Sequence, residues 1–96
     1  MVGRSGTHQG KFITATRKAA EKAALRISVP ARKVPGAADR NRIKRWLREL
    51  WRRSRFSKER NTLFDVRIVR ADGISFKALQ EELVGAEASL LTKVPH

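Results

Sequence analysis

The sequence contains no cysteine, and this absence excludes several kinds of site. Without thiols the chain cannot form disulfides, present a cysteine nucleophile or hold zinc through cysteine ligands, and it fits a reducing compartment. Histidine is also scarce, with only His8 and His96, both in expected tails. No carboxylate pair or nucleophile with a nearby base is evident, so we expect no catalytic residue and no cofactor in the protein itself.

Long apolar segments are missing too. No segment approaches the roughly 18 apolar residues of a membrane span, and residues 1–10 lack the apolar core of a secretory signal. The expected location is therefore the cytoplasm. The length of 96 residues indicates one domain with a modest core. We expect a flexible basic tail at 1–10, which holds three glycines, followed by a single domain at 11–93.

Acidic residues are few. Nine Asp and Glu face 22 Lys and Arg, which gives a net charge of +13 and a pI near 11.6. Such a charge repels itself in a compact domain, so it indicates a polyanionic partner. An anionic membrane surface is the competing explanation, but no segment joins a basic face to a broad apolar face free to insert. Nucleic acid is favoured, and charge alone leaves DNA and RNA open.

The spacing of apolar residues predicts both strands and helices. Alternating and β-branched segments predict three strands, at residues 11–16, 25–29 and 64–69. Residues 17–24 fit either a helix, on their Ala, Lys and Glu content, or a hairpin connection between two strands. Residues 55–62 are expected to be a polar linker.

Two helices are expected between and after these strands. The first follows Asp39, whose carboxylate can cap the first turn, and runs to about Ser54. The second follows Ser75 as its cap and continues towards Leu91. The order of elements predicts an α+β fold in which a small sheet of three to four strands packs with both helices.

The first helix separates into two faces on a helical wheel. An apolar arc of roughly 140° forms the side expected to be buried. It contains Ile43, Trp46, Leu47, Leu50 and Trp51. Around the remainder of residues 40–53, seven cations surround a single acid, Glu49. Charged faces that serve solubility mix the two signs, whereas like charges at i,i+4 repel each other. A face of this kind predicts contacts with phosphates, which six arginines can bind in bidentate fashion.

The start of this helix resembles a known family signature. Arg40-Asn41-Arg42-Ile43-Lys44-Arg45-Trp46-Leu47-Arg48-Glu49 is similar to the RNR motif of the bacterial ribonuclease P protein component, R-N-R-x-K-R-x-x-R-E, and matches every fixed position. Val29-Pro30-Ala31-Arg32 resembles the strand end that precedes the motif in that family. Asp65-Val66-Arg67-Ile68-Val69-Arg70 resembles the strand that follows it. The likeness covers about residues 10–91.

The resemblance implies a partner and a function. Members of this family are basic subunits of a ribozyme that removes the 5′ leader of precursor tRNA, and the RNA with its bound Mg²⁺ carries the chemistry. The protein binds the catalytic RNA through the RNR region and holds the leader in a cleft between that helix and the sheet. The family fold is an α/β sandwich that joins two parallel strands by a left-handed βαβ crossover, against the usual hand. We expect the protein to be monomeric in the complex.

The resemblance also implies site residues by position. The expected RNA contacts are Arg32, Lys33, Arg40, Asn41, Arg42, Lys44, Arg45, Arg48 and Arg52. The expected leader contacts are Phe12, Val29, Lys44 and Arg48. Phe12 fits an ordinary core position equally well, and Asn41 fits a local hydrogen bond in the first turn. Family members usually begin with a helix before the first strand, whereas ten Gly-rich residues stand there in this chain, so one wall of the leader cleft is expected to be missing.

A generic basic module is the alternative interpretation. A ribosomal-type RNA-binding protein or a DNA-binding protein would explain the charge equally well, and only the RNR signature and its flanks argue against it. A DNA reader is expected to show a helix-turn-helix pair. Here the loop before Arg40 follows a predicted strand instead.

Overall fold

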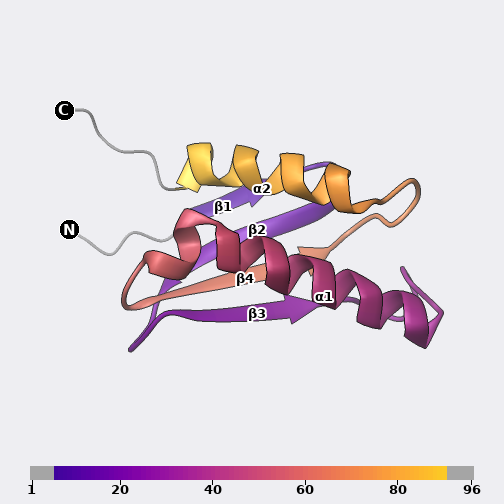
Figure 1. The fold of residues 1–96 in the computed structure, drawn as a ribbon, viewed down its shortest axis with the longest axis horizontal. Helices are drawn as coiled ribbons and strands as arrows, with labels where there is room; N and C mark the ends of the chain where they lie inside the picture. Colours follow the sequence, from indigo (N-terminus) through magenta and orange to yellow (C-terminus); the bar gives the residue numbers. More distant parts are fainter. Residues whose placement is uncertain (1–5, 91–96) are drawn as a thin grey trace.

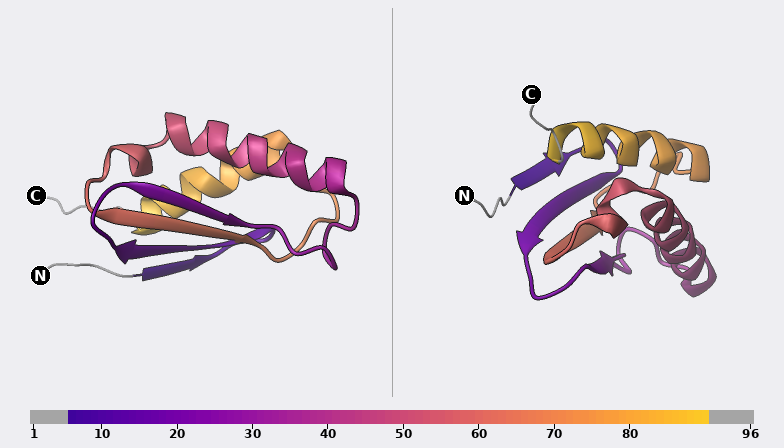
Figure 2. Two further views of the ribbon diagram at one scale, coloured as in Figure 1. Left: turned by 90° about the horizontal axis from the view of Figure 1, so that it is seen from below. Right: turned by 60° about the vertical axis from the view of Figure 1, so that its left-hand side comes forward.

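The computed structural model describes residues 6–90 and has the expected α+β fold. Both helices cover one face of a four-stranded sheet (Figures 1 and 2). The elements in chain order are β1 (Gly6–Gln9), β2 (Ile13–Ala19), β3 (Ala24–Ser28), α1 (Ala37–Arg53), the 3₁₀ helix η1 (Arg55–Lys58), β4 (Thr62–Ile68) and α2 (Phe76–Leu90). The expected positions of Leu91 and His96, and the domain limit at residue 93, lie outside the described residues.

The sheet has the order β1-β2-β4-β3 and mixes the two kinds of pairing. β2 is antiparallel to both β1 and β4, whereas β3 and β4 are parallel and are joined through α1. The βαβ unit is thus present, and its left-handed crossing remains a prediction. Because β4 lies between β2 and β3, residues 20–23 connect two strands that are not neighbours. Pairing with β4 extends β2 to Ala19, so the helix and the hairpin considered for 17–24 are both wrong.

The expected flexible tail is wrong for residues 6–9, which form the edge strand β1. Its glycine content indicated disorder, but main-chain pairing with β2 does not depend on side chains. Gly10 completes the turn, and its N–H donates to the carbonyl of Ile13 at 2.8 Å. The Glu82 carboxylate on α2 accepts from the N–H groups of Phe12 (2.8 Å) and Ile13 (3.2 Å). A Cβ on Gly10 would overlap the Glu82 carboxylate, which would have to move from its place beside the Phe12 and Ile13 N–H groups.

The core lies between the helix-facing side of the sheet and the two helices. Strand alternation places Ile13, Ala15, Phe64, Val66 and Ile68 on this side, all buried. The apolar arc expected on α1 is confirmed. Ile43, Leu47 and Leu50 are buried, and both tryptophans pack against the core while remaining half-buried. From α2, Leu79, Leu83 and Ala86 complete the layer.

The segment 55–62 differs from the expected polar linker because it contains η1 with a buried aromatic ring. Phe56 is 1% exposed and stacks on Phe64, with ring centroids 3.8 Å apart. The isolated Phe56 among charged neighbours gave no periodic signal. The Ser54 hydroxyl caps η1 by accepting from the Phe56 N–H at 3.2 Å. One apolar residue thus fixes the connection between α1 and β4.

The helix ends follow two different capping arrangements. Ser75 Oγ accepts from the Ala78 N–H at 3.1 Å, which confirms the expected cap of α2. α1 instead begins at Ala37 after Gly36, without a side-chain cap. Asp39 lies inside the first turn and pairs with Arg42, so its expected capping position is wrong. A carboxylate in a first turn still stabilises the helix through its dipole.

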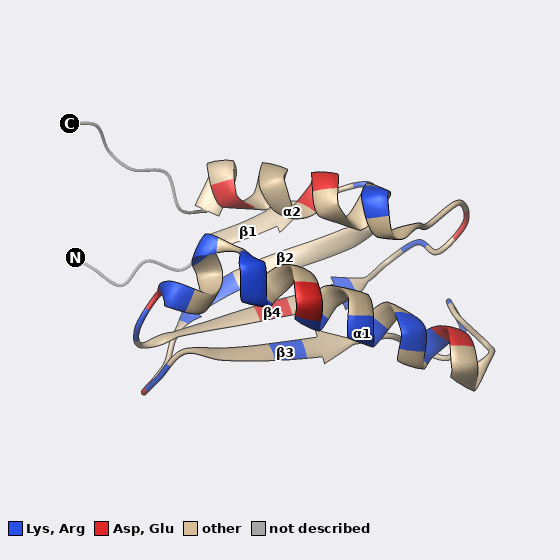
Figure 3. Cartoon of the chain, viewed as in Figure 1, with Lys and Arg blue, Asp and Glu red and all other residues tan. Residues whose placement is uncertain are grey.

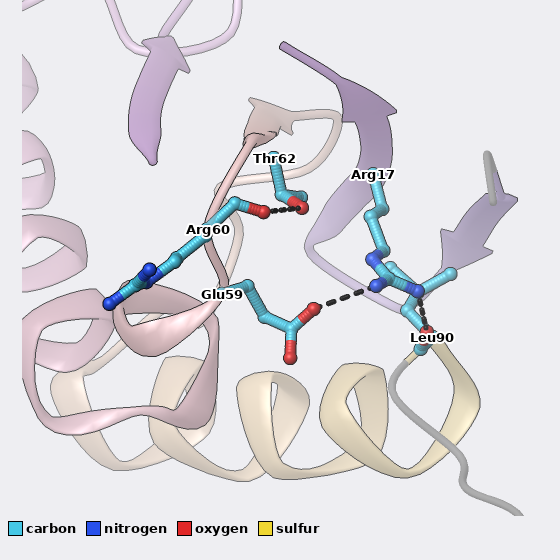
Figure 4. A network of polar contacts seen from close by, with 5 residues as sticks. All are labelled: Arg17, Glu59, Arg60, Thr62 and Leu90. Carbon is cyan, nitrogen blue, oxygen red and sulfur yellow. Dashed lines mark hydrogen bonds and ion pairs between the residues drawn. The ribbon is translucent and has the colours of Figure 1, made fainter. Parts of the chain in front are cut away.

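Arg17 of β2 ties the last turn of α2 to the loop before β4. Its guanidinium donates to the Leu90 carbonyl at 3.0 Å and pairs with Glu59 at 2.7 Å (Figure 4). A cation at a helix C-terminus also complements the helix dipole. Within residues 6–90, neither helix is long and apolar enough to cross a membrane.

Candidate nucleic-acid interface

Lys and Arg recur along the whole of α1 (Figure 3), and most of these cations are exposed. Arg42, Arg45, Arg48 and Arg52 are exposed, and Asn41 is exposed beside them. By contrast, α2 carries three glutamates and one lysine. The positive charge therefore gathers on one helix, as the wheel predicted. A polyanion would meet the α1 side of the molecule first, because α2 opposes it with acidic groups.

Only some of these cations are neutralised by the protein. Arg42 pairs with Asp39, and Glu49 pairs with Arg52 at 3.2 Å and Arg53 at 2.8 Å. Such surface pairs contribute little stability and exchange readily for other partners.

Three further cations, Lys44, Arg45 and Arg48, form no hydrogen bond or ion pair with any part of the chain between residues 6 and 90. We call these three residues the unpaired cations. Their head groups are already free to meet phosphates, so binding there breaks no ion pair.

Arg40 has a structural task that the sequence did not indicate. Its guanidinium donates to the carbonyls of Val34 (2.9 Å) and Pro35 (2.8 Å). This clamp holds the loop between β3 and α1 against the first turn of the helix. The loop also presents the expected contacts Arg32 and Lys33, both exposed. Arg40 thus positions neighbouring cations whether or not it touches a ligand itself.

Two grooves adjoin α1. The first, which we call the α1–β3 groove, has a volume of about 280 Å³. It is lined by Leu25, Ile27, Lys44, Arg48, Trp51 and Arg52. The second, of similar volume, lies at the start of α1 and brings Lys33 together with Arg42 and Trp46. Arg42 lies 5.7 Å from the centre of the Trp46 ring, within cation–π range.

The structure separates the four expected leader contacts. Lys44 and Arg48 share the α1–β3 groove, whereas Val29 is half-buried against the core and is not among its lining residues. Phe12 lies in the turn before β2 and is only 6% exposed. This burial favours the core position over the cleft position, and a leader contact through Phe12 stays a prediction. The Phe12 side chain belongs to the core.

A polar groove on the uncovered face of the sheet was missed in the sequence. It has a volume of about 270 Å³ and is lined by Thr14, Thr16, Arg26, Ser28, Asp65 and Arg67. Register brings Asp65 opposite both Thr16 and Arg26, and Arg67 opposite Thr14 and Ser28. The alternation of polar residues along β2 and β4 was the available signal. Asp65, Arg26 and Arg67 give this uncovered face of the sheet both negative and positive charges.

Together these features define a small α+β protein with a mixed sheet, two helices on one face and a polycationic helix whose charges are largely unneutralised. The chain belongs to the ribonuclease P protein family, because the family model for Ribonuclease P matches residues 3–90, and it is a bacterial protein component of that enzyme. Membership of this family indicates that the chain takes part in an endoribonuclease that processes tRNA. It also indicates that the chain has an RNA partner in that complex. No curated protein matches the chain.

Two solved structures share its fold. The ribonuclease P protein from Thermotoga maritima in complex with 1-(4-fluorophenyl)-2-thiourea is 20% identical, with a TM-score of 0.71 over 85% of this chain and 82% of that one. A second structure of the Thermotoga maritima ribonuclease P protein is also 20% identical, with a TM-score of 0.69 over 85% and 80%. At 20% sequence identity, this similarity shows a shared fold alone.

Proposed function

We propose that this ribonuclease P protein binds the catalytic RNA of its complex through the exposed face of α1. It then holds the 5′ leader of precursor tRNA beside that helix. The unpaired cations Lys44, Arg45 and Arg48 carry the proposal, because three free positive groups on one rigid helix are costly without an anionic partner. Arg42 and Arg52 add contacts once RNA replaces their surface carboxylate partners.

The chemistry in this proposal belongs to the RNA. Mg²⁺ bound by the partner RNA would supply the chemistry of cleavage, and the protein supplies positive charge that lets the RNA and its substrate approach each other. Each cation that meets a phosphate releases condensed counterions, and this release drives assembly. The protein acts as a monomer in the complex, in the cytoplasm.

Leader binding is the more detailed part of the proposal. Lys44 and Arg48 stand on the wall of the α1–β3 groove, above the apolar side chains of Leu25 and Ile27. A single strand in this groove would place its phosphates on the cations. Phe12, in the turn before β2, is buried, and neither Phe12 nor Val29 is among the residues that line this groove.

Magnesium titration of a reconstituted enzyme tests the function. We expect the chain to lower the Mg²⁺ concentration at which a bacterial ribonuclease P RNA cleaves precursor tRNA several-fold, because its cations replace divalent ions in screening phosphates. The protein alone is expected to leave the substrate uncut. An unrelated basic protein of similar charge serves as the control. If both proteins shift the titration equally, or neither does, the chain is a generic RNA-binding module.

A further inference from the structure

The loop between β3 and α1, residues 29–36, carries two exposed cations on a backbone that is fixed from within. The Pro30 carbonyl accepts from the N–H groups of Lys33 and Val34, both at 3.0 Å. The Val34 side chain is 5% exposed and belongs to the core. Arg32 and Lys33 therefore stand on a short, internally bonded turn, with their side chains exposed.

Arg40 fastens this loop to the helix. Its Nη1 donates to the carbonyls of Val34 at 2.9 Å and Pro35 at 2.8 Å. Arg40 is half-buried, whereas Arg42 and Arg45 are exposed. It is the fourth residue of α1, close to the positive end of the helix dipole, where a cation is unfavourable. Charge-assisted hydrogen bonds to two carbonyls offset that cost, so the position favours a guanidinium that holds the loop.

The groove at the start of α1 shows what this clamp brings together. Lys33 from the loop and Arg42 from the helix line the same groove, which has a volume of about 280 Å³. An RNA segment that crosses the groove meets both cations at once while the loop keeps its place. A loop without its clamp has to be ordered when RNA binds, and such ordering lowers the affinity.

We propose that Arg40 is a positioning residue for RNA binding, which acts through Arg32 and Lys33 and makes no phosphate contact of its own. Its two hydrogen bonds preorganise the loop, so that both loop cations reach the catalytic RNA without an ordering cost. This inference rests on the proposed function. It adds the loop to the interface and separates the first arginine of the RNR signature from the unpaired cations, which bind the RNA directly.

A double-mutant cycle tests this role, because it shows whether Arg40 acts independently of the loop cations. Arg40→Met removes the donors and the charge while keeping an unbranched side chain. In the unmodified chain it should weaken binding to ribonuclease P RNA about 10-fold, since the loop is then ordered only on binding. In a chain that already carries Arg32→Ala and Lys33→Ala, it should change the affinity by less than about 2-fold. Equal losses in both backgrounds would show that Arg40 contacts the RNA itself, and would overturn the inference.

Arg17→Met is the matched control for a general loss of structure. Arg17 also donates to a main-chain carbonyl, that of Leu90 at 3.0 Å, and it lies on β2, outside the loop and α1. Its substitution should lower the melting temperature and leave the RNA affinity unchanged. A loss of affinity equal to that of Arg40→Met would mean that any weakened fold binds RNA poorly, and the inference would be wrong. Arg40→Gln is the second variant if Arg40→Met does not fold.

A spin label measures the clamp in the absence of RNA. The chain has no cysteine, so Ala31→Cys provides a single site for a nitroxide on the exposed turn of the loop. We expect the label to move faster when Arg40→Met is added and to keep its mobility when Arg17→Met is added. An unchanged spectrum with Arg40→Met would contradict the clamp, because the loop would then hold its place without the guanidinium.

Failure of this inference can be told apart from failure of the proposed function. If the chain lowers the Mg²⁺ requirement of the ribonuclease P RNA while Arg40→Met costs the same affinity in both backgrounds, the inference is wrong and the proposed function stands. If Arg40→Met frees the spin label while the unmodified chain leaves the Mg²⁺ titration unchanged, the proposed function is wrong, and the clamp serves the fold alone.

Discussion

Replacing Arg45 and Arg48 together with alanine is expected to weaken binding to ribonuclease P RNA roughly 100-fold, because each arginine makes a charge-assisted hydrogen bond to a phosphate. Both side chains are exposed and unpaired in the described part of the chain, so the substitutions remove no internal hydrogen bond or ion pair. The loss should therefore lie in binding, with the melting temperature nearly unchanged.

The dependence on salt identifies the cause of that loss. Each phosphate contact contributes roughly 0.7–0.9 to the slope of log affinity against log salt. The double variant should therefore flatten the slope by about 1.4 to 1.8. Filter binding from low to high salt measures it. Lys22→Ala with Lys77→Ala removes two exposed charges away from α1 and is the matched control. If both pairs flatten the slope equally, the interface is not on α1.

Phe56→Ala is expected to lower the free energy of unfolding by about 3–5 kcal/mol, the usual cost of truncating a buried phenylalanine. The ring is 1% exposed and stacks on Phe64 of β4, so its loss leaves a cavity beside that ring. The total free energy of unfolding of a domain of this size is roughly 5–15 kcal/mol. The variant should therefore be close to its unfolding threshold.

Urea denaturation at fixed sulfate concentration measures this loss. Phe76→Ala is the control, since Phe76 is half-buried and contacts Trp46 edge-on. It should lose markedly less stability than Phe56→Ala. A loss below about 1 kcal/mol for Phe56→Ala would mean that residues 55–62 act only as the polar linker expected from the sequence, and that the stacked pair contributes little.

Periodic patterns made most of the fold predictable. In the apolar arc of α1 and in the alternation of β4, several residues together indicate the same element, because all of them point to one buried face. The elements that were missed lack this redundancy. β1 is a glycine-containing edge strand held by main-chain bonds, and η1 depends on the single residue Phe56. The extent of β2 was hidden because its pairing partner β4 is distant in sequence.

For the candidate site, the sequence located the binding face but did not show which of its residues are free to bind. The charge of α1 and its signature located the face, since repulsion between like charges needs a partner whatever the fold. Sequence could not distinguish a free cation such as Arg48 from Arg40, whose guanidinium is engaged by two carbonyls of the preceding loop. Nor could it decide between core and surface for Phe12, because that depends on how the β1–β2 turn meets α2.

Tethered hydroxyl-radical cleavage tests the central claim, that the exposed face of α1 lies on the catalytic RNA. The chain has no cysteine, so one introduced thiol carries the iron probe at a single known position. Asn41→Cys on α1 and Gln80→Cys on α2 are matched, since both side chains are exposed and uncharged. We predict strong, localised cleavage of ribonuclease P RNA from position 41 and little from position 80. Equal cleavage from both positions, or cleavage from position 80 alone, would contradict the account.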